Sequence, residues 1–251
     1  MTPLTPSFLT HPFAHRGLHD LAQGRGENAP ASIQAAIDAG YGIEIDVQLS
    51  RDGAAMVFHD DHLGRLTNAT GLVRDWDAAD LAGLPLSGTS DHIPTLTQVL
   101  DQVAGQVPML VEIKDQDGQM GPNLGPLEQA TAQALRGYAG DVAVMSFNPH
   151  AVAKIAPMLA GIPLGLVTDR YLQSDWPDLN PDVRAHLRGI PDFERAGCSF
   201  ISHNQAQLDD PAVAALKARG VPVLCWTVRS QADEAQARKL ADNITFEGYL
   251  P

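Results

Sequence analysis

The chain has 251 residues, of which 44% are hydrophobic and 19% charged, a composition that supports a folded core and excludes a disordered or low-complexity chain. Its 17 basic and 30 acidic residues give a formal net charge of −13 at pH 7, which argues against general binding to nucleic acid or to an anionic membrane surface. No stretch of 18 apolar residues is present, and the first twelve residues lack the basic and apolar segments of a signal peptide.

These properties predict a cytoplasmic protein with no stable membrane association and no nucleic-acid partner. The chain contains two cysteines, Cys198 and Cys225, which are too few for a disulfide framework and do not form a CxxC pair. Both are surrounded by apolar residues, so we expect buried structural thiols. No pattern in the sequence predicts an oligomeric state.

Short apolar runs alternate with longer amphipathic segments along most of the chain. Strands are predicted at residues 12–15, 43–47, 55–59, 109–114, 142–147, 163–167, 200–203, 221–228 and 243–246. Helices are predicted at residues 31–39, 96–104, 127–138, 149–159, 211–219 and 231–240, several with proline near the start or glycine just after the end. Alternation of strands and helices predicts a parallel sheet or a barrel.

The second and third predicted strands are joined only by residues 50–53, a connection too short for a crossover helix. They should therefore form an antiparallel hairpin, and a two-residue turn at Asp52-Gly53 would place Asp46 opposite His59. Eight strands remain, as in a (β/α)8 barrel that occupies residues 1–251 as one domain. Residues 62–94 are polar and glycine-rich, and we expect them to form a small insertion that covers the mouth of the barrel.

Polar residues stand at four predicted strand ends, where a buried strand should be apolar. They are His15 and Arg16, Glu44 and Asp46, His59 and Asp60, and Glu112 and Lys114. Residues two apart in a strand point to the same face, and the chemistry of such barrels lies at the C-terminal ends of the strands. We therefore expect these four groups to converge on one site.

Three of these side chains, Glu44, Asp46 and Glu112, are carboxylates that would repel one another without a cation between them. An all-oxygen ligand set favours one divalent cation, either Mg²⁺ or Ca²⁺, over Zn²⁺. Taken singly, the Glu44/Asp46 pair is also compatible with a buried ion pair to Arg16, and the combination of the four groups favours the metal site.

Two histidines, His15 and His59, supply groups that titrate near neutral pH and can act as general base and general acid. Arg16 and Lys114 add fixed positive charge, and with a divalent cation the site carries about one net positive charge. This combination suits a singly charged phosphodiester, whose cleavage requires charge neutralisation and proton transfer at the entering and leaving oxygens.

Taken in order, these segments resemble the glycerophosphodiester phosphodiesterase family over nearly the whole chain. The matching residues are His15-Arg16-Gly17, Glu27-Asn28, Ile43-Glu44-Ile45-Asp46-Val47, Arg51-Asp52-Gly53, Val57-Phe58-His59-Asp60, Arg65-Leu66-Thr67, Ile93-Pro94-Thr95-Leu96, Val111-Glu112-Ile113-Lys114, Ser146-Phe147 and Trp226-Thr227-Val228. The resemblance implies a (β/α)8 (TIM) barrel of the phospholipase C-like phosphodiesterase type. It also implies metal-dependent hydrolysis of a small glycerophosphodiester, such as glycerophosphocholine, to sn-glycerol 3-phosphate and an alcohol.

The resemblance also implies site roles. The metal is expected at Glu44, Asp46 and Glu112, the catalytic histidines are His15 and His59, and Arg16 and Lys114 match phosphate-contacting positions. Trp226 matches an aromatic residue near the glycerol moiety, although by itself it would be predicted to pack in the core.

Three positions depart from the family pattern: Ala29 replaces a threonine, Arg229 replaces an asparagine, and the terminal Thr-Asp-x-Pro pattern is missing at residues 244–251. Arg229 could favour a more anionic alcohol. The sequence does not assign acid and base between the two histidines, nor distinguish attack by water from attack by the neighbouring glycerol hydroxyl. Two alternatives remain: a lysophospholipase-D-like or phosphoinositide-like phosphodiesterase on the same barrel, and a non-catalytic barrel that binds glycerophosphodiesters.

Overall fold

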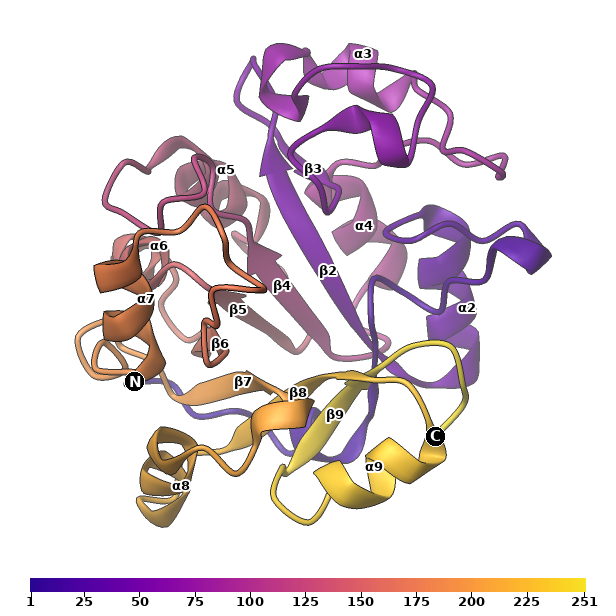
Figure 1. Ribbon diagram of the computed structural model, residues 1–251. Helices are drawn as coiled ribbons and strands as arrows, with labels where there is room; N and C mark the ends of the chain where they lie inside the picture. Colours follow the sequence, from indigo (N-terminus) through magenta and orange to yellow (C-terminus); the bar gives the residue numbers. More distant parts are fainter.

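The computed structural model describes residues 1–251, and its centre is a closed barrel of eight parallel strands (Figure 1). The nine strands of the sheet are β1 (Phe13–Ala14), β2 (Gly42–Leu49), β3 (Ala55–Val57), β4 (Met109–Ile113), β5 (Val142–Ser146), β6 (Leu164–Thr168), β7 (Phe200–Asn204), β8 (Val223–Val228) and β9 (Asn243–Phe246). Their order is β1-β9-β8-β7-β6-β5-β4-β2-β3, and a further pairing of β1 with β2 closes the barrel. The predicted (β/α)8 barrel is confirmed, and β3 lies outside the closed ring.

Helices surround the strands. They are α1 (Ser7–Thr10), α2 (Pro30–Ala39), α3 (Ala78–Ala82), α4 (Leu96–Val103), α5 (Pro126–Ala134), α6 (Pro149–Ile155), α7 (Pro181–Arg188), α8 (Pro211–Ala218) and α9 (Gln231–Ala237). The buried faces of most of these helices join the outer face of the barrel in one hydrophobic cluster. None of the helices combines the length and the apolar character that crossing a membrane would require.

The hairpin of β2 and β3 is antiparallel as predicted, but its predicted register is wrong by one residue. Val47 pairs with Val57, and Asp46 accepts a backbone hydrogen bond from Phe58 rather than facing His59. The loop contains three residues because Ser50 N–H donates to the carbonyl of Ala54, and this pair closes the hairpin one residue earlier than a two-residue turn would. Both cysteines are buried and unpaired, as predicted.

Aromatic rings fill the lower part of the barrel interior. Phe13 stacks on Phe8 of the N-terminal helix, with 5.7 Å between ring centroids. Two glycines give these rings room: a Cβ at Gly42 would lie 2.7 Å from the Phe13 ring, and one at Gly165 would lie 2.4 Å from the Phe200 ring. The barrel interior at the N-terminal ends of the strands is therefore filled by packed side chains.

The insertion at residues 62–94 forms a small hydrophobic cluster of its own with β3, around Phe58, Leu63 and Leu81. It lies beyond the end of β2, at the top of Figure 1. The expectation that it covers the mouth is wrong, because none of its residues lines the cavity there. Its apolar side chains pack against Met56 on β3, which holds the insertion to one flank of the barrel.

Candidate active site

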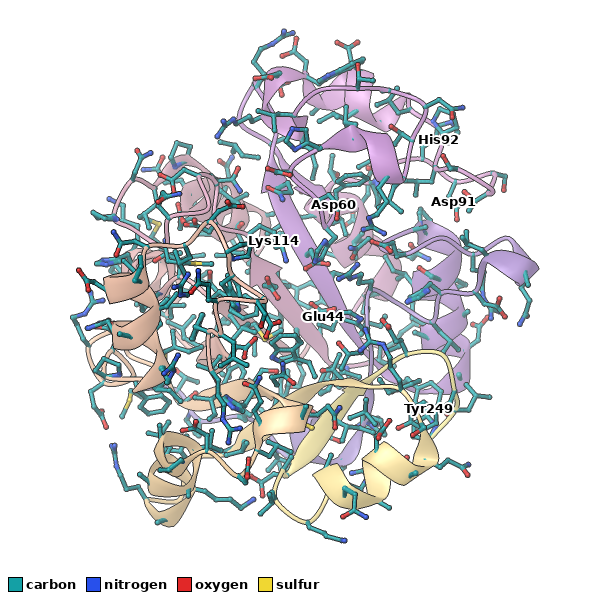
Figure 2. All side chains as sticks on the ribbon, viewed as in Figure 1. Glu44, Asp60, Asp91, His92, Lys114 and Tyr249 are labelled. Carbon is teal, nitrogen blue, oxygen red and sulfur yellow. The ribbon has the colours of Figure 1, made fainter.

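A cavity of about 140 Å³ opens at the C-terminal ends of the strands, and all eight residues predicted for the site line it. They are His15, Arg16, Glu44, Asp46, His59, Glu112, Lys114 and Trp226. In Figure 2, Glu44 and Lys114 lie in the middle of the view, on β2 and just beyond β4, whereas Asp91 and His92 lie away from the barrel. The C-terminal ends of all strands meet at one end of a parallel barrel, so residues as far apart in the sequence as His15 and Trp226 line the same cavity.

Three buried carboxylates form the base of this site. Glu44 and Asp46 project from β2 and Glu112 from β4, where Asp46 and Glu112 are direct partners in the strand register. One ligand oxygen from each lies within 4.8 Å of the others. Two-residue spacing on one strand and pairing with the adjacent strand together place three acidic groups around a single point.

Lys114 and Arg16 border the carboxylates. Lys114 Nζ lies 2.8 Å from Glu112 Oε1 and 3.2 Å from Asp46 Oδ1, so that one ammonium is shared by two carboxylates. Arg16 Nε lies 3.6 Å from Asp46 Oδ2, and the backbone N–H of Arg16 donates to Glu44 Oε2 at 3.0 Å. The Nε of Arg16 is buried and makes no hydrogen bond, and Nη1 donates to Glu27 Oε1, so Nη2 is the guanidinium nitrogen left to bind an anion.

Two residues with left-handed backbone hold Asp46. Arg16 and Asn28 both have φ of 56°, and the backbone N–H of Asn28 donates to the carbonyl of Arg16. The side-chain amide of Asn28 then donates to Asp46 Oδ2 at 2.9 Å. A left-handed residue other than glycine costs about 1–2 kcal/mol, so these two turns are held in place by the surrounding contacts and orient Asp46.

Each histidine of the site has a carboxylate behind its Nδ1 atom. His59 Nδ1 lies 2.7 Å from Asp60 Oδ1, and Arg65 of the insertion donates two hydrogen bonds to the same carboxylate. Arg65 also binds Glu27, which binds Arg16, so the insertion reaches the site through this chain of ion pairs.

On the other side of the site, His15 Nδ1 lies 2.5 Å from Glu247 Oε2, and His15 Nε2 lies 4.0 Å from Glu44 Oε2. The ring is therefore held between a carboxylate outside the cavity and the acidic cluster inside it. Burial lowers the pKa of His15 despite the opposing hydrogen bond to Glu247, and this favours the neutral imidazole near neutral pH.

The remaining wall of the cavity is apolar. Phe147 and Trp226 meet edge to face with 5.4 Å between ring centroids, and Met145 and Val167 line the cavity beneath them. Trp226 Nε1 donates to the carbonyl of Ser202, which fixes the indole ring in place. A ligand in this cavity would meet charged groups at one side and aromatic carbon at the other.

The three buried carboxylates of Glu44, Asp46 and Glu112 have only two neighbouring cations, Arg16 and Lys114, to balance their negative charge. Burial raises the pKa of Glu44 well above its usual value, and the charges of Asp46 and Glu112 raise it further. Burial opposes ionisation of Asp46 too, but Lys114, His59 and Arg16 hold the pKa of Asp46 well below its usual range. A bound divalent cation would relieve this imbalance, and the three carboxylates offer only oxygen ligands, which suits Mg²⁺ or Ca²⁺.

Sequence reasoning missed three residues that shape the site: Glu247, Asn28 as the partner of Asp46, and Phe147 as part of the apolar wall. Glu247 follows β9 directly, so the rule that located the other groups, a polar residue at a strand's C-terminal end, could have found it. Arg229 also lines the cavity, and its Nε lies 2.7 Å from Glu247 Oε1.

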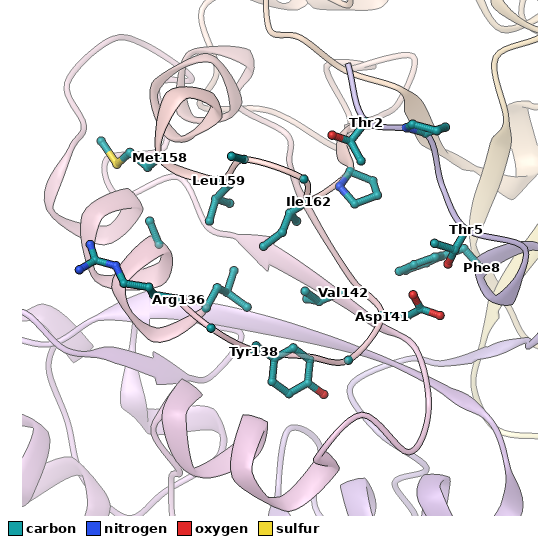
Figure 3. A pocket seen from close by; sticks show the side chains of 18 residues that line it. Thr2, Thr5, Phe8, Arg136, Tyr138, Asp141, Val142, Met158, Leu159 and Ile162 are labelled. Atoms are coloured by element: carbon teal, nitrogen blue, oxygen red, sulfur yellow. The ribbon is translucent and has the colours of Figure 1, made fainter.

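A larger cavity, of about 400 Å³, lies at the opposite end of the barrel, around the starts of β5 and β6 (Figure 3). The N-terminal segment with Phe8 lines one side, and Tyr138 and Ile162 line others. Its charged residues, Arg136 and Asp141, form no acidic or histidine cluster. The size of a cavity therefore does not identify the functional site in this barrel.

Comparison with known proteins agrees with this geometry. The model of the "Glycerophosphoryl diester phosphodiesterase family" matches residues 15–243. A putative glycerophosphodiester phosphodiesterase of Bacillus subtilis is 25% identical over 236 residues, which cover 90% of this chain and 89% of the relative. A glycerophosphodiester phosphodiesterase of Caldanaerobacter subterraneus is 31% identical over 173 residues, which cover 65% of this chain and 68% of that protein.

Solved structures give the same result. A phosphodiesterase of Oleispira antarctica, solved in complex with the product sn-glycerol-3-phosphate, superimposes with a TM-score of 0.77 at 25% identity. The superposition covers 96% of this chain and 94% of the other. With a barrel of this type, a cavity at its C-terminal end and a match over most of its length, the chain belongs to the glycerophosphodiester phosphodiesterase family of enzymes.

Proposed function

We propose that this enzyme hydrolyses sn-glycerol-3-phosphodiesters, such as glycerophosphocholine, to sn-glycerol 3-phosphate and an alcohol, with a divalent cation and with His15 and His59 as acid–base catalysts. The observation that carries this proposal is the convergence of three buried carboxylates, two cations and two histidines on one cavity of about 140 Å³. A cavity of this size suits a small molecule, and the product complex of the Oleispira relative supports a glycerol phosphate ligand.

Glu44, Asp46 and Glu112 would hold the cation, which when bound supplies positive charge that neutralises the phosphoryl oxygens. Asn28 keeps Asp46 oriented for this task, and the backbone N–H of Arg16 does the same for Glu44. The choice between Mg²⁺ and Ca²⁺ depends on coordination number and cavity size, and both suit a carboxylate set.

Arg16 and Lys114 would bind the phosphodiester itself. Without a bound cation, Lys114 shares its charge between the carboxylates of Asp46 and Glu112. A cation bound to those carboxylates would leave the ammonium of Lys114 available to the phosphodiester. Nη2 of Arg16 makes no hydrogen bond within the protein and can donate to a phosphoryl oxygen. Trp226 and Phe147 would pack against the carbon atoms of the glycerol moiety, because they form the apolar wall of the same cavity.

His15 and His59 would transfer the protons. One accepts the proton of the attacking hydroxyl as its oxygen bonds to phosphorus, the P–O bond to the alcohol breaks, and the other donates a proton to the departing oxygen. The two histidines then exchange one proton each with solvent, which restores their starting states. Each imidazole presents Nε2 to the cavity because its Nδ1 is bound to a carboxylate, Glu247 or Asp60. The same arrangement serves water or the glycerol hydroxyl as nucleophile.

A substrate panel tests this proposal. Protein stripped with EDTA and then supplied with Mg²⁺ or Ca²⁺ is given glycerophosphocholine and, in parallel, lysophosphatidylcholine. We expect glycerol 3-phosphate from the first substrate at a kcat/KM at least tenfold above that for the second. Preferential cleavage of the lysophospholipid would favour the lysophospholipase-D-like reaction, and tight binding of substrate without product in either metal would favour a non-catalytic barrel.

A further inference from the structure

Glu247 stands between His15 and Arg229 at the edge of the site. Its Oε2 lies 2.5 Å from His15 Nδ1, and its Oε1 lies 2.7 Å from Arg229 Nε. His19 Nε2 lies farther away, at 3.7 Å from the same Oε2. The Glu247 side chain is only 20% exposed, while that of Arg229 is 63% exposed, so the arginine closes the contact from the solvent side.

The protonation states of His15 and Glu247 follow from which atoms donate and which accept in the contacts from Arg229 through Glu247 to His15. The hydrogen bond from His15 holds the pKa of Glu247 well below its usual range, so Glu247 is an acceptor at both oxygens. Arg229 is always a donor. The Nδ1 atom of His15 must therefore carry a proton, which leaves the lone pair of the neutral ring on Nε2, the atom that faces Glu44 and the cavity.

We propose that Glu247 is the positioning residue that sets the tautomer and orientation of His15, and that Arg229 holds Glu247 in place. This proposal rests on the catalytic role proposed for His15. It also explains two departures from the family pattern together, because Arg229 and Glu247 are partners. The Nε of Arg229 donates to Glu247, whereas its terminal guanidinium nitrogens make no hydrogen bond within the protein. The structure therefore supports a role for Arg229 in holding Glu247 rather than in binding the alcohol.

The substitution Glu247→Gln separates this role from simple packing. Glutamine has the same shape, but one of its two acceptor oxygens becomes an NH₂ donor. Arg229 Nε–H is a permanent charged donor and takes the remaining oxygen, so the amide NH₂ faces His15 Nδ1. The ring must then accept at Nδ1 and carry its proton on Nε2, which is the wrong tautomer for a base that faces the substrate.

Kinetics of a double substitution provide the first test. We expect E247Q to lower kcat for glycerophosphocholine by about 10- to 100-fold, the usual range for a lost orienting partner, with KM changed by less than about twofold. R229M alone should also lower kcat, by about three- to tenfold and less than E247Q does, because Glu247 keeps its contact with His15 but loses the partner that holds it. R229M/E247Q should be more active than E247Q by at least about fivefold, because the amide can then turn its oxygen towards His15.

Glu234 provides a matched control. It also accepts from an arginine Nε, that of Arg238 at 2.7 Å, and from a second donor, Tyr249 Oη at 3.1 Å, but no histidine is involved. E234Q should retain wild-type kcat. E247Q with kcat within twofold of wild type, or a double variant no better than E247Q, would overturn the proposal. An R229M variant with normal kcat and raised KM only for an anionic diester such as glycerophosphoserine would show that Arg229 binds the alcohol instead.

Long-range ¹H–¹⁵N spectra of metal-free protein at pH 8 test the tautomer without relying on activity. The signal of His15, assigned by its loss in H15N, should place the proton on Nδ1 in the wild type and on Nε2 in E247Q. A wild-type proton on Nε2 overturns the positioning role even if the enzyme is active. If the tautomer switches as expected but the wild type hydrolyses no glycerophosphodiester, the proposed reaction fails while the positioning of His15 stands.

Discussion

Replacing Glu44 with glutamine should make the metal-free protein more stable and at the same time remove its response to metal. The ligand oxygens of Glu44, Asp46 and Glu112 lie within 4.8 Å of one another, so each pair of charges repels by about 3.5 kcal/mol or more at an effective dielectric constant of 20. Lys114 binds both Asp46 and Glu112 and offsets about one of these two charges. Arg16 reduces the remainder further, so we expect a net gain of roughly 1–3 kcal/mol for E44Q.

This gain should depend on pH. The folded-state pKa of Glu44 is raised by burial and then by the neighbouring carboxylates, above its ordinary value of 4.5. Wild-type and E44Q proteins should therefore be equally stable well below pH 4.5, where Glu44 is protonated in both folded and unfolded states. As the pH rises towards the folded-state pKa, the metal-free wild type loses stability and the advantage of E44Q grows.

Thermal unfolding in EDTA across a pH series measures this difference. A gain of 1–3 kcal/mol corresponds to about 2–12 °C in Tm for a chain of this length. Metal at about 100 times its Kd should then stabilise the wild type by about 2.7 kcal/mol but leave E44Q unchanged. Glutamine has nearly the same shape as glutamate and can still accept the hydrogen bond from Arg16 N–H. The difference in Tm between wild type and E44Q therefore reports the change in charge.

Glu128 is a matched control, because it is also buried, with its pKa raised by burial, and accepts a backbone N–H from Gly125. E128Q should keep the full rise in Tm on addition of metal. The reasoning is refuted if metal-free E44Q is less stable than the wild type at pH 7–8, or if metal raises its Tm as much as it raises that of the wild type.

Two further substitutions test the histidines and the barrel interior. His59→Ala should lower kcat by about 10²–10⁴-fold, the usual contribution of general acid–base catalysis, while the exposed His62→Ala leaves kcat unchanged; equal kcat values for both variants would contradict the role of His59. Gly165→Ala places a Cβ 2.4 Å from the Phe200 ring and should cost about 1–3 kcal/mol in urea unfolding. Gly121→Ala, where a Cβ meets nothing within 4 Å, should be close to neutral.

The fold and the site's composition could be predicted because both follow from local rules. Strand and helix alternation with one short hairpin predicts eight barrel strands, and polar residues at strand ends predict which side chains meet. Seven of these eight polar residues line the same cavity, and the eighth, Asp60, binds His59 Nδ1. Trp226 also lines the cavity, but only the family resemblance predicted its place in the site. Glu247 follows the same rule, because it comes directly after β9. It was not predicted because residues 244–251 lack the Thr-Asp-x-Pro pattern of the family, and the glutamate was not considered as a replacement for the missing aspartate.

Other features depend on geometry that the sequence does not encode locally. The register of the β2–β3 hairpin is set by whether Ser50 or Arg51 closes the loop, and a difference of one residue moves every pair. Helix α7 was not predicted because it buries little apolar surface, although Asn180 caps its start and Pro181 opens it. The insertion packs against Met56 of β3, and this contact sets its position. The expectation that it covers the mouth was based only on its closeness to His59 in the sequence, which does not predict that contact.

Metal add-back to the stripped enzyme tests the central claim most directly. Protein treated with EDTA is incubated with glycerophosphocholine, and glycerol 3-phosphate is measured with Mg²⁺, with Ca²⁺ and with no addition, for the wild type and for Asp46→Asn. We predict that at least one cation restores product formation in the wild type and that neither restores it in the variant. Equal product without added metal, or full activity of Asp46→Asn, would contradict a catalytic cation held by the three carboxylates.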